Sequence, residues 1–183
     1  MRGTPTAARN LDGYGAPLIE WERVREVLHG EITQAPGTGG PGRHTAWLTT
    51  IAPDGRPHVR PLGVISVDGT WYFTSGPGTR KSANLVRDPR CVLNVATRPF
   101  DLVVEGEAER VVERDVLRAV ATAFAVEGWP AMVAGTALTA EFSAPSAGPP
   151  PWYLYRVVPS VIYALGAEEP YGATRFDLDR PAG

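Results

Sequence analysis

The chain has 183 residues, a formal net charge of -2, 43% hydrophobic residues and 21% charged residues. This length fits one domain with a substantial core, and the near-neutral charge offers no basic field for nucleic acid. There is no apolar run of signal-peptide or membrane-span length, so we expect a cytoplasmic protein without a membrane partner. The single cysteine, Cys91, lies in an apolar run and is expected to pack in the core.

The N-terminal part predicts an arm, a helix and a loop. Residues 1–17 are rich in Gly, Ala, Pro and Arg without an apolar period, which is typical of a flexible arm. Apolar residues recur at helical spacing in residues 18–32 and predict an amphipathic helix. Residues 35–43 are mostly Gly and Pro and predict a loop.

A pattern of short strands and tight turns begins at Trp47. The predicted strands are 47–51, 58–65, 70–74, 91–96 and 101–112. Pro53-Asp54-Gly55-Arg56 and Asp68-Gly69 supply turns between the first three strands. Gly106 interrupts the last strand and predicts a bend at a barrel corner.

Helices surround these strands in the prediction, and strand character returns near the C-terminus. Helices are predicted at 79–87, ended by Asp88-Pro89, at 115–126 with Asp115 as N-cap, and at 130–142. Residues 143–151 predict a second loop, and the strand-like segments that follow are 152–158, 161–165 and 172–178. Short antiparallel strands with only peripheral helices indicate a mainly β fold (α+β) that closes into a small barrel. We therefore expect an arm (1–17), one barrel domain (18–178) and a C-terminal tail (179–183).

The clearest chemical signal lies where the 70–74 strand ends and the next helix starts. Thr74 and Ser75 end the strand, a glycine turn follows, and the helix opens with Arg80 and Lys81, the only lysine of the chain. Free N–H groups at a helix start, the positive end of the helix dipole and two cations are suited to binding a phosphate. Taken alone, the segment also fits an ordinary surface turn with solvated charges.

A neighbouring strand brings further candidates to this turn. His58 and Arg60 are two residues apart, so alternation places them on one face of the predicted strand. Closure of the hairpin then adds another cation to Arg80 and Lys81. The three histidines, His29, His44 and His58, lack cysteine or paired carboxylates at metal-ligand spacing, so no metal site is predicted. A hydrolase triad has no support because no Gly-x-Ser-x-Gly elbow is present.

Several motifs occur in a fixed order over roughly residues 46–109. They are Trp47-Leu48-Thr49-Thr50, Pro53-Asp54-Gly55-Arg56-Pro57-His58-Val59-Arg60-Pro61, Trp71-Tyr72-Phe73-Thr74-Ser75, Thr79-Arg80-Lys81-Ser82-Ala83-Asn84-Leu85 and Asp88-Pro89-Arg90. The ordered set resembles the pyridoxamine 5'-phosphate oxidase-like family of FMN-binding split barrels. This resemblance implies an antiparallel split β-barrel and a homodimer with FMN at the subunit interface.

The resemblance also implies a set of cofactor-binding residues. In the family the matching Arg-Lys pair and strand-end Thr-Ser hold the FMN phosphate, and the strand matching residues 58–62 lies along the flavin ring. A weaker C-terminal match adds Arg175. The implied cofactor-binding residues are His58, Arg60, Thr74, Ser75, Arg80, Lys81, Asn84 and Arg175.

The function implied by the resemblance is hydride or electron transfer between the flavin and a small organic substrate. No side chain need act as a catalytic residue, because the cofactor carries the chemistry. The chain lacks the Arg-Leu-His-Asp-Arg motif of true pyridoxamine 5'-phosphate oxidases, so that substrate is not expected. Two alternatives stay open, a reductase that uses a deazaflavin coenzyme and a non-catalytic protein that binds flavin or haem.

Overall fold

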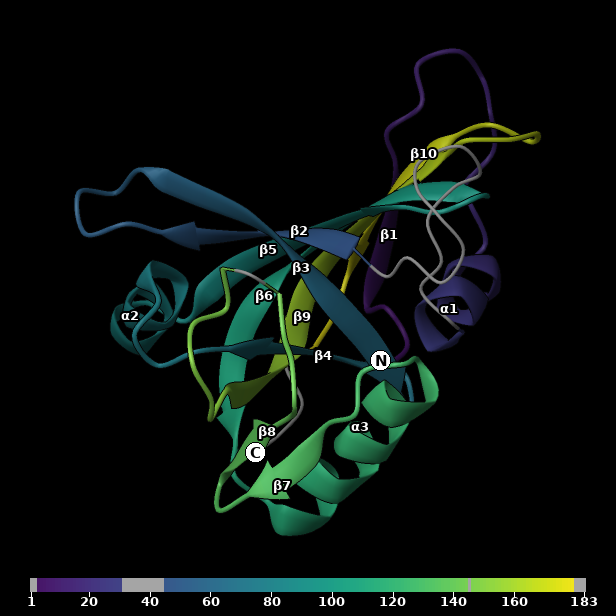
Figure 1. The fold of residues 1–183 in the computed structure, drawn as a ribbon. Helices are drawn as coiled ribbons and strands as arrows, with labels where there is room; N and C mark the ends of the chain where they lie inside the picture. The colour runs from purple at the N-terminus through teal and green to yellow at the C-terminus, as the bar shows by residue number, and fades with distance from the viewer. Residues whose placement is uncertain (1–2, 31–44, 145, 180–183) are drawn as a thin grey trace.

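The computed structural model describes residues 3–30, 45–144 and 146–179, which form a β-barrel with helices on its outside (Figure 1). The strands are β1 (Ala7–Asn10), β2 (Thr45–Ile51), β3 (Pro57–Val67), β4 (Thr70–Ser75), β5 (Arg90–Ala96), β6 (Phe100–Val111), β7 (Met132–Ala134), β8 (Ala137–Thr139), β9 (Tyr153–Gly166) and β10 (Ala173–Asp177). The helices are α1 (Trp21–His29), α2 (Arg80–Arg87) and α3 (Arg114–Val126). None of the helices in these ranges combines the length and apolar character needed to cross a membrane.

Strand β9 closes the barrel. One of its edges pairs along almost its whole length with β6, while the other edge is shared between β4, which pairs with residues 153–156, and β10, which pairs with residues 161–165. From β4 the sheet continues through β3, β2 and β5 to β6 and so returns to β9, with every pairing antiparallel. The structure therefore confirms the predicted antiparallel split barrel.

Two apolar cores lie on opposite faces of the β3–β4 region. The barrel interior holds large side chains that are almost fully buried, among them Leu48, Trp71, Phe73, Leu93, Leu102 and Ile162. Helix α3 covers the other face and buries Leu117, Val120 and Phe124 against Ile65 and Leu154. Burial of side chains of this size contributes about 1.5–3 kcal/mol each, so the two cores fix the strands that carry the candidate site.

Gly106 marks the corner of the barrel, as predicted. The β6–β9 register shifts between Glu105 and Gly106, which is a β-bulge. A Cβ atom on Gly106 would lie 2.1 Å from the carbonyl oxygen of Val158, so no other residue fits without moving the backbone. The glycine is needed for a close approach of two strands.

One predicted helix is wrong. Residues 130–142 form the short hairpin β7–β8 in place of a helix, and Gly135 in its turn has φ of 63°, which glycine adopts easily. The Ala-rich composition favours a helix, but a Gly-Thr pair between two short apolar runs is typical of a two-residue hairpin loop. The hairpin packs beside α3 (Figure 1).

Smaller differences concern the ends of elements. Residues 18–20 precede α1 in extended form, and the two predicted strands 152–158 and 161–165 are one continuous strand, β9. Ala7–Asn10, within the segment expected to be a flexible arm, pairs with β10 as strand β1. The predicted loop 35–43, the end of the predicted helix at 31–32, His44 and residues 180–183 lie outside the described residues. The division into arm, domain and tail stays a prediction.

We predict that Gly106→Ala lowers the free energy of unfolding by about 3 kcal/mol, because the added methyl group meets backbone at the bulge and backbone relaxes less readily than side chains. Urea denaturation followed by tryptophan fluorescence measures the change. Gly63→Ala is the matched control, since a Cβ there has nothing within 4 Å, and it should change stability by less than about 1 kcal/mol. Equal stability of the two variants would contradict the packing account of Gly106.

Candidate functional site

The start of α2 is fixed by Thr79. This residue has extended backbone angles, with φ of -83° and ψ of 151°, and its Oγ1 accepts a hydrogen bond of 3.3 Å from the Ser82 backbone N–H. That is the geometry of an N-cap. The N–H groups of Arg80 and Lys81 lie before the first intrahelical bond and remain directed outward at the helix start. The predicted helix start at the glycine turn is confirmed.

A chain of hydroxyl groups lies beneath this turn. Ser82 Oγ donates to Ser75 Oγ at 2.7 Å, Ser75 and Thr79 are joined at 2.9 Å, and Thr79 Oγ1 donates to the Gly76 carbonyl at 2.9 Å. Since Thr79 gives its proton to Gly76, Ser75 must donate to Thr79. All three protons are then used inside the turn. These hydroxyls hold the turn in shape, and the groups left for a ligand are backbone N–H groups and cations.

A wide cavity of about 810 Å³, the basic pocket, opens in front of the helix start. Its lining includes His58, Arg60, Pro61, the turn 76–79, Arg80, Lys81 and residues 146–150. Among the described residues, Arg60, Arg80 and Lys81 form no salt bridge with an acid. The acid Asp54 pairs with Arg56 and also feels the charge of Arg80. Three cations without a salt bridge at one cavity match an anionic ligand of high charge.

Lys81 is the cation of this pocket that is most withdrawn from water. Its side chain is about half buried, and burial, followed by the charge of Arg60, lowers the pKa of the Lys81 ammonium below its ordinary value. Removing an ammonium from water without a partner is unfavourable. A bound phosphate oxygen would supply that partner, so the donor set fits a phosphate.

His58 lies at the inner wall of the basic pocket. The ring is buried, its Nδ1 is 3.5 Å from Thr50 Oγ1, and Thr50 Oγ1 accepts a 2.9 Å hydrogen bond from the Asn84 side-chain amide. The other ring nitrogen, Nε2, is buried without a hydrogen-bond partner among the described residues. Burial, and then the charges of Arg60, Arg80 and Lys81, lower the pKa of His58.

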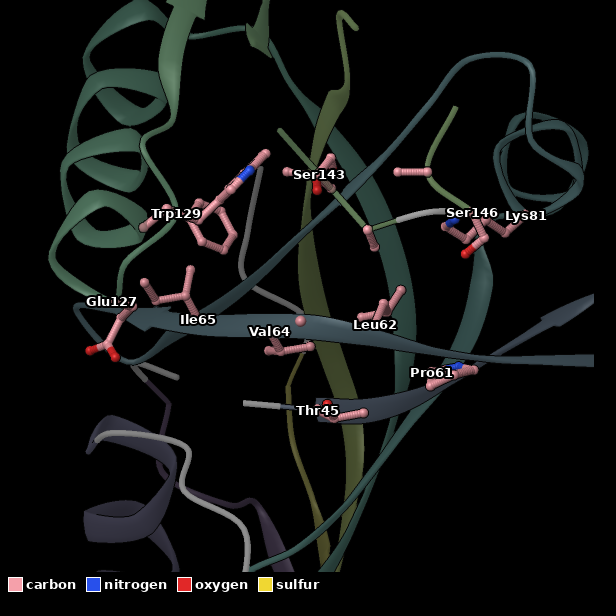
Figure 2. A pocket seen from close by; sticks show the side chains of 15 residues that line it. Thr45, Pro61, Leu62, Val64, Ile65, Lys81, Glu127, Trp129, Ser143 and Ser146 are labelled. Carbon is pink, nitrogen blue, oxygen red and sulfur yellow. The ribbon is translucent and has the colours of Figure 1, made fainter. Parts of the chain in front are cut away.

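A second cavity, the apolar pocket, adjoins the basic pocket. Its volume is about 270 Å³, β3 lines it with Leu62, Val64 and Ile65, and Ile65 and Trp129 lie on the same side of this strand (Figure 2). The two cavities share Pro61, Lys81, Ser146 and Ala147 as lining residues. A ligand with a charged end and a flat apolar end can therefore occupy both at once.

Two tryptophans hold the segment that borders both cavities. The indole N–H of Trp129 donates to the Phe142 carbonyl at 2.7 Å, and that of Trp152 donates to the Gly148 carbonyl at 3.2 Å. The two rings are in contact, with centroids 5.7 Å apart. On the opposite side, Gly76 allows a close approach, since a Cβ there would lie 2.5 Å from the Ala147 carbonyl oxygen.

The structure brings together four of the eight residues expected to bind a cofactor, His58, Arg60, Arg80 and Lys81, at the basic pocket. Thr74 lines the apolar pocket. Ser75 and Asn84 are buried behind the site and support it through hydrogen bonds. Arg175 lines neither cavity, and its guanidinium binds Asp177 and the Tyr163 hydroxyl.

Some supporting residues were missed by sequence reasoning. Thr50 joins Asn84 to His58 across 34 and 8 positions of sequence, a separation that no local pattern encodes. Thr79 itself, in contrast, is a residue type that favours the N-cap position, and its place before the predicted helix is a signal that the sequence contains. In the part of the chain that the structure describes, no three His, Cys, Asp or Glu side chains are grouped as a metal site.

Comparison with known proteins adds a family and a fold. A family model described as pyridoxamine 5'-phosphate oxidase matches residues 40–150. No curated protein matches the chain in sequence.

Solved structures share the fold at low identity. A conserved hypothetical protein from Mycobacterium tuberculosis has a TM-score of 0.55 and 17% identity, covering 91% of this chain and 89% of its own. A pyridoxamine 5'-phosphate oxidase-related, FMN binding protein from Nostoc punctiforme has a TM-score of 0.50 and 18% identity, covering 75% and 87%. A heme binding protein from Mycobacterium smegmatis has a TM-score of 0.53 and 12% identity, covering 72% and 52%.

We predict that Thr79→Ala destabilises the protein by about 1–2 kcal/mol, because it removes the cap of α2 and the acceptor of the Ser75 hydroxyl. Thr79→Ser keeps the hydroxyl and is expected to retain most of that stability. Urea unfolding of the three proteins measures the difference. If the alanine and serine variants were equally stable, the hydroxyl chain would have no structural role.

Proposed function

The chain belongs to the pyridoxamine 5'-phosphate oxidase family, and from this premise we propose that it binds FMN as an oxidoreductase cofactor. The observation that carries the proposal is the set Arg60 of β3 with Arg80 and Lys81 of α2, which line the basic pocket and have no salt bridge among the described residues. A terminal phosphate carries a charge of about -1.5 to -2 at neutral pH. It would neutralise these cations and accept hydrogen bonds from the N–H groups of the helix start.

The adjoining cavity accounts for the other end of the cofactor. Leu62, Val64 and Ile65 of β3 give this cavity an apolar lining, and Trp129 provides an aromatic wall on the side of Ile65 (Figure 2). A planar ring is favoured there by burial of apolar area and by contact with the indole. Lys81 borders both cavities, so it lies at the junction between phosphate and ring.

In this proposal the protein binds and orients, and the bound flavin supplies hydride or electron transfer. Arg80 and Lys81 hold the phosphate, and Arg60 adds positive charge on the strand that runs beneath the ring. The apolar pocket keeps water from the reacting face, and no side chain of the chain is required as a nucleophile. The second reactant is a small organic substrate that meets the exposed face of the ring.

We predict that the purified protein binds FMN and that Arg80→Ala with Lys81→Ala weakens binding at least about 100-fold. Each charged hydrogen bond contributes about 1.5–3 kcal/mol, so the loss of two costs about 3–6 kcal/mol of binding free energy. Each 1.4 kcal/mol corresponds to about tenfold in affinity. Quenching of flavin fluorescence on titration measures the affinity. Riboflavin, which has no phosphate, should bind the double variant and the parent protein equally.

Arg98→Ala is the matched control for this experiment. Arg98 lies between β5 and β6, pairs with Glu168 and lines neither cavity, so its loss should leave FMN affinity unchanged. An unchanged affinity in the double variant would sink the phosphate assignment. Binding of a deazaflavin coenzyme in place of FMN, or a Soret band on addition of haem, would replace FMN by one of those ligands.

We further propose that two copies of the chain associate through the outer face of β2 and β3. Trp47 and Val59 are large apolar side chains that stay exposed on this face. The register pairs Trp47 with Pro61, which lines both cavities, so an occupant of this face would border the site. Exposed apolar side chains grouped on a sheet face are typical of interfaces.

We predict that Trp47→Asp shifts the protein from dimer to monomer, because a carboxylate cannot be buried there without a partner. Light scattering coupled to size exclusion measures the mass. Val126→Asp is the control, since Val126 is exposed at the end of α3 and should not affect association. A parent protein that is monomeric at high concentration would contradict this part of the proposal.

A further inference from the structure

We propose that His58 takes up a proton when a phosphate enters the basic pocket and thereby becomes a fourth cationic ligand. The inference rests on the phosphate-binding part of the proposed function and couples that binding to the uptake of a proton by His58. His58 lines this pocket and is buried, and the residues named below all lie in the described part of the chain.

The first support is the unpaired ring nitrogen. His58 is 9% exposed and lines the basic pocket, and its Nε2 has no hydrogen-bond partner among the described residues. Buried polar atoms are almost always satisfied in folded proteins. A phosphate oxygen would accept a hydrogen bond from Nε2–H at this position. The ligand would thus supply the partner that Nε2 lacks among the described residues.

The second support is the way Thr50 accommodates both states of the ring. Thr50 Oγ1 accepts from the Asn84 amide at 2.9 Å and lies 3.5 Å from His58 Nδ1 and 3.4 Å from the His58 carbonyl oxygen. With a neutral ring, Thr50 donates to Nδ1 and Nε2 carries the hydrogen. With a protonated ring, Nδ1–H donates to Thr50, whose own proton turns to the carbonyl. Both arrangements satisfy Nδ1.

The charged groups around the ring set the direction of the change. Arg60 lies on the same strand and Arg80 and Lys81 come from α2, while the contacts from β2 and α2 behind the ring, Thr50 and Asn84, are neutral. Asp54, in the β2–β3 turn, is already paired with Arg56. Burial and three cations lower the pKa of His58, so the free ring is neutral at pH 7. A bound phosphate dianion counteracts the effect of these three cations and so raises the pKa of His58.

The linkage has a definite sign. Because the pKa of His58 is higher in the complex than in the free protein, binding is strongest at low pH and weakens as pH rises through the pKa of the complex. The weakening approaches about tenfold per pH unit where the complex holds one more proton than its components. The phosphate itself has a second pKa of about 6, so measurements at pH 7–9 avoid its titration.

Calorimetric titration of FMN in buffers of different ionisation enthalpy measures protons taken up on binding. We expect the parent protein to take up more protons per FMN than His58→Gln, by up to one, because the glutamine amide can donate to phosphate but does not titrate. The parent should also lose more affinity than His58→Gln between pH 7 and pH 9. The difference between the two proteins removes any part due to Lys81. His29→Gln, an exposed histidine away from the pocket, should behave as the parent.

A measurement on the parent protein avoids dependence on the variant. Proton NMR titration of the three histidine rings should show one ring whose pKa rises when FMN is added. Inorganic phosphate is titrated in parallel. Uptake with phosphate but no binding of FMN would support His58 and reject FMN as the ligand. Absence of proton uptake with both ligands, or equal uptake in His58→Gln, would overturn the inference.

Discussion

The start of β9 fixes the geometry on which the candidate site depends. Tyr153 pairs with Ser75, the last residue of β4, so the chain leaves the sheet at this point and turns into α2. The preceding residue, Trp152, holds the Gly148 carbonyl and so positions the segment that faces this turn. Farther along, between Arg156 and Val161, the same edge of β9 passes from β4 to β10, so the split of the barrel lies at the other end of the β4 pairing. Both walls of the basic pocket are therefore set by one strand end.

The basic pocket brings three cations, Arg60, Arg80 and Lys81, to one cavity. Elsewhere arginines such as Arg90, Arg156 and Arg175 are paired with nearby carboxylates, whereas the cations of the basic pocket have no such partner among the described residues. Like charges at close range destabilise the free fold and are tolerated where a ligand neutralises them. The hydroxyls beneath the turn cannot share this role, because their protons are already used. Recognition in the basic pocket therefore depends on charge and on the helix start.

The sequence predicts the cations of the site better than the groups that orient them. Arg80 and Lys81 follow a glycine turn at a helix start, and His58 and Arg60 alternate on one strand, so local patterns suffice for these residues. The hydrogen bonds from Asn84 through Thr50 to His58 depend on three separate elements and leave no local signal. The predicted helix at 130–142 is wrong, because the Gly-Thr pair at its centre forms the turn of a hairpin. Arg175 was expected at the site only because of a weak C-terminal match to the family, and in the structure its guanidinium pairs with Asp177.

Lys81, the single lysine of the chain, lies at a position where the different shapes of a lysine and an arginine side chain matter. Lys81 borders both cavities, so its head group lies at the passage from the charged end to the apolar end. An ammonium is a compact charge on a flexible apolar stem, and that stem can lie along the apolar pocket while the charge reaches the phosphate. A guanidinium is wider and planar, and at this junction it would compete for space with the ring of the proposed cofactor. Arg80, which lines only the basic pocket, has the planar guanidinium whose two-pronged binding suits the oxygens of a phosphate. The division of cations between the two residue types thus follows the shape of the joined cavities.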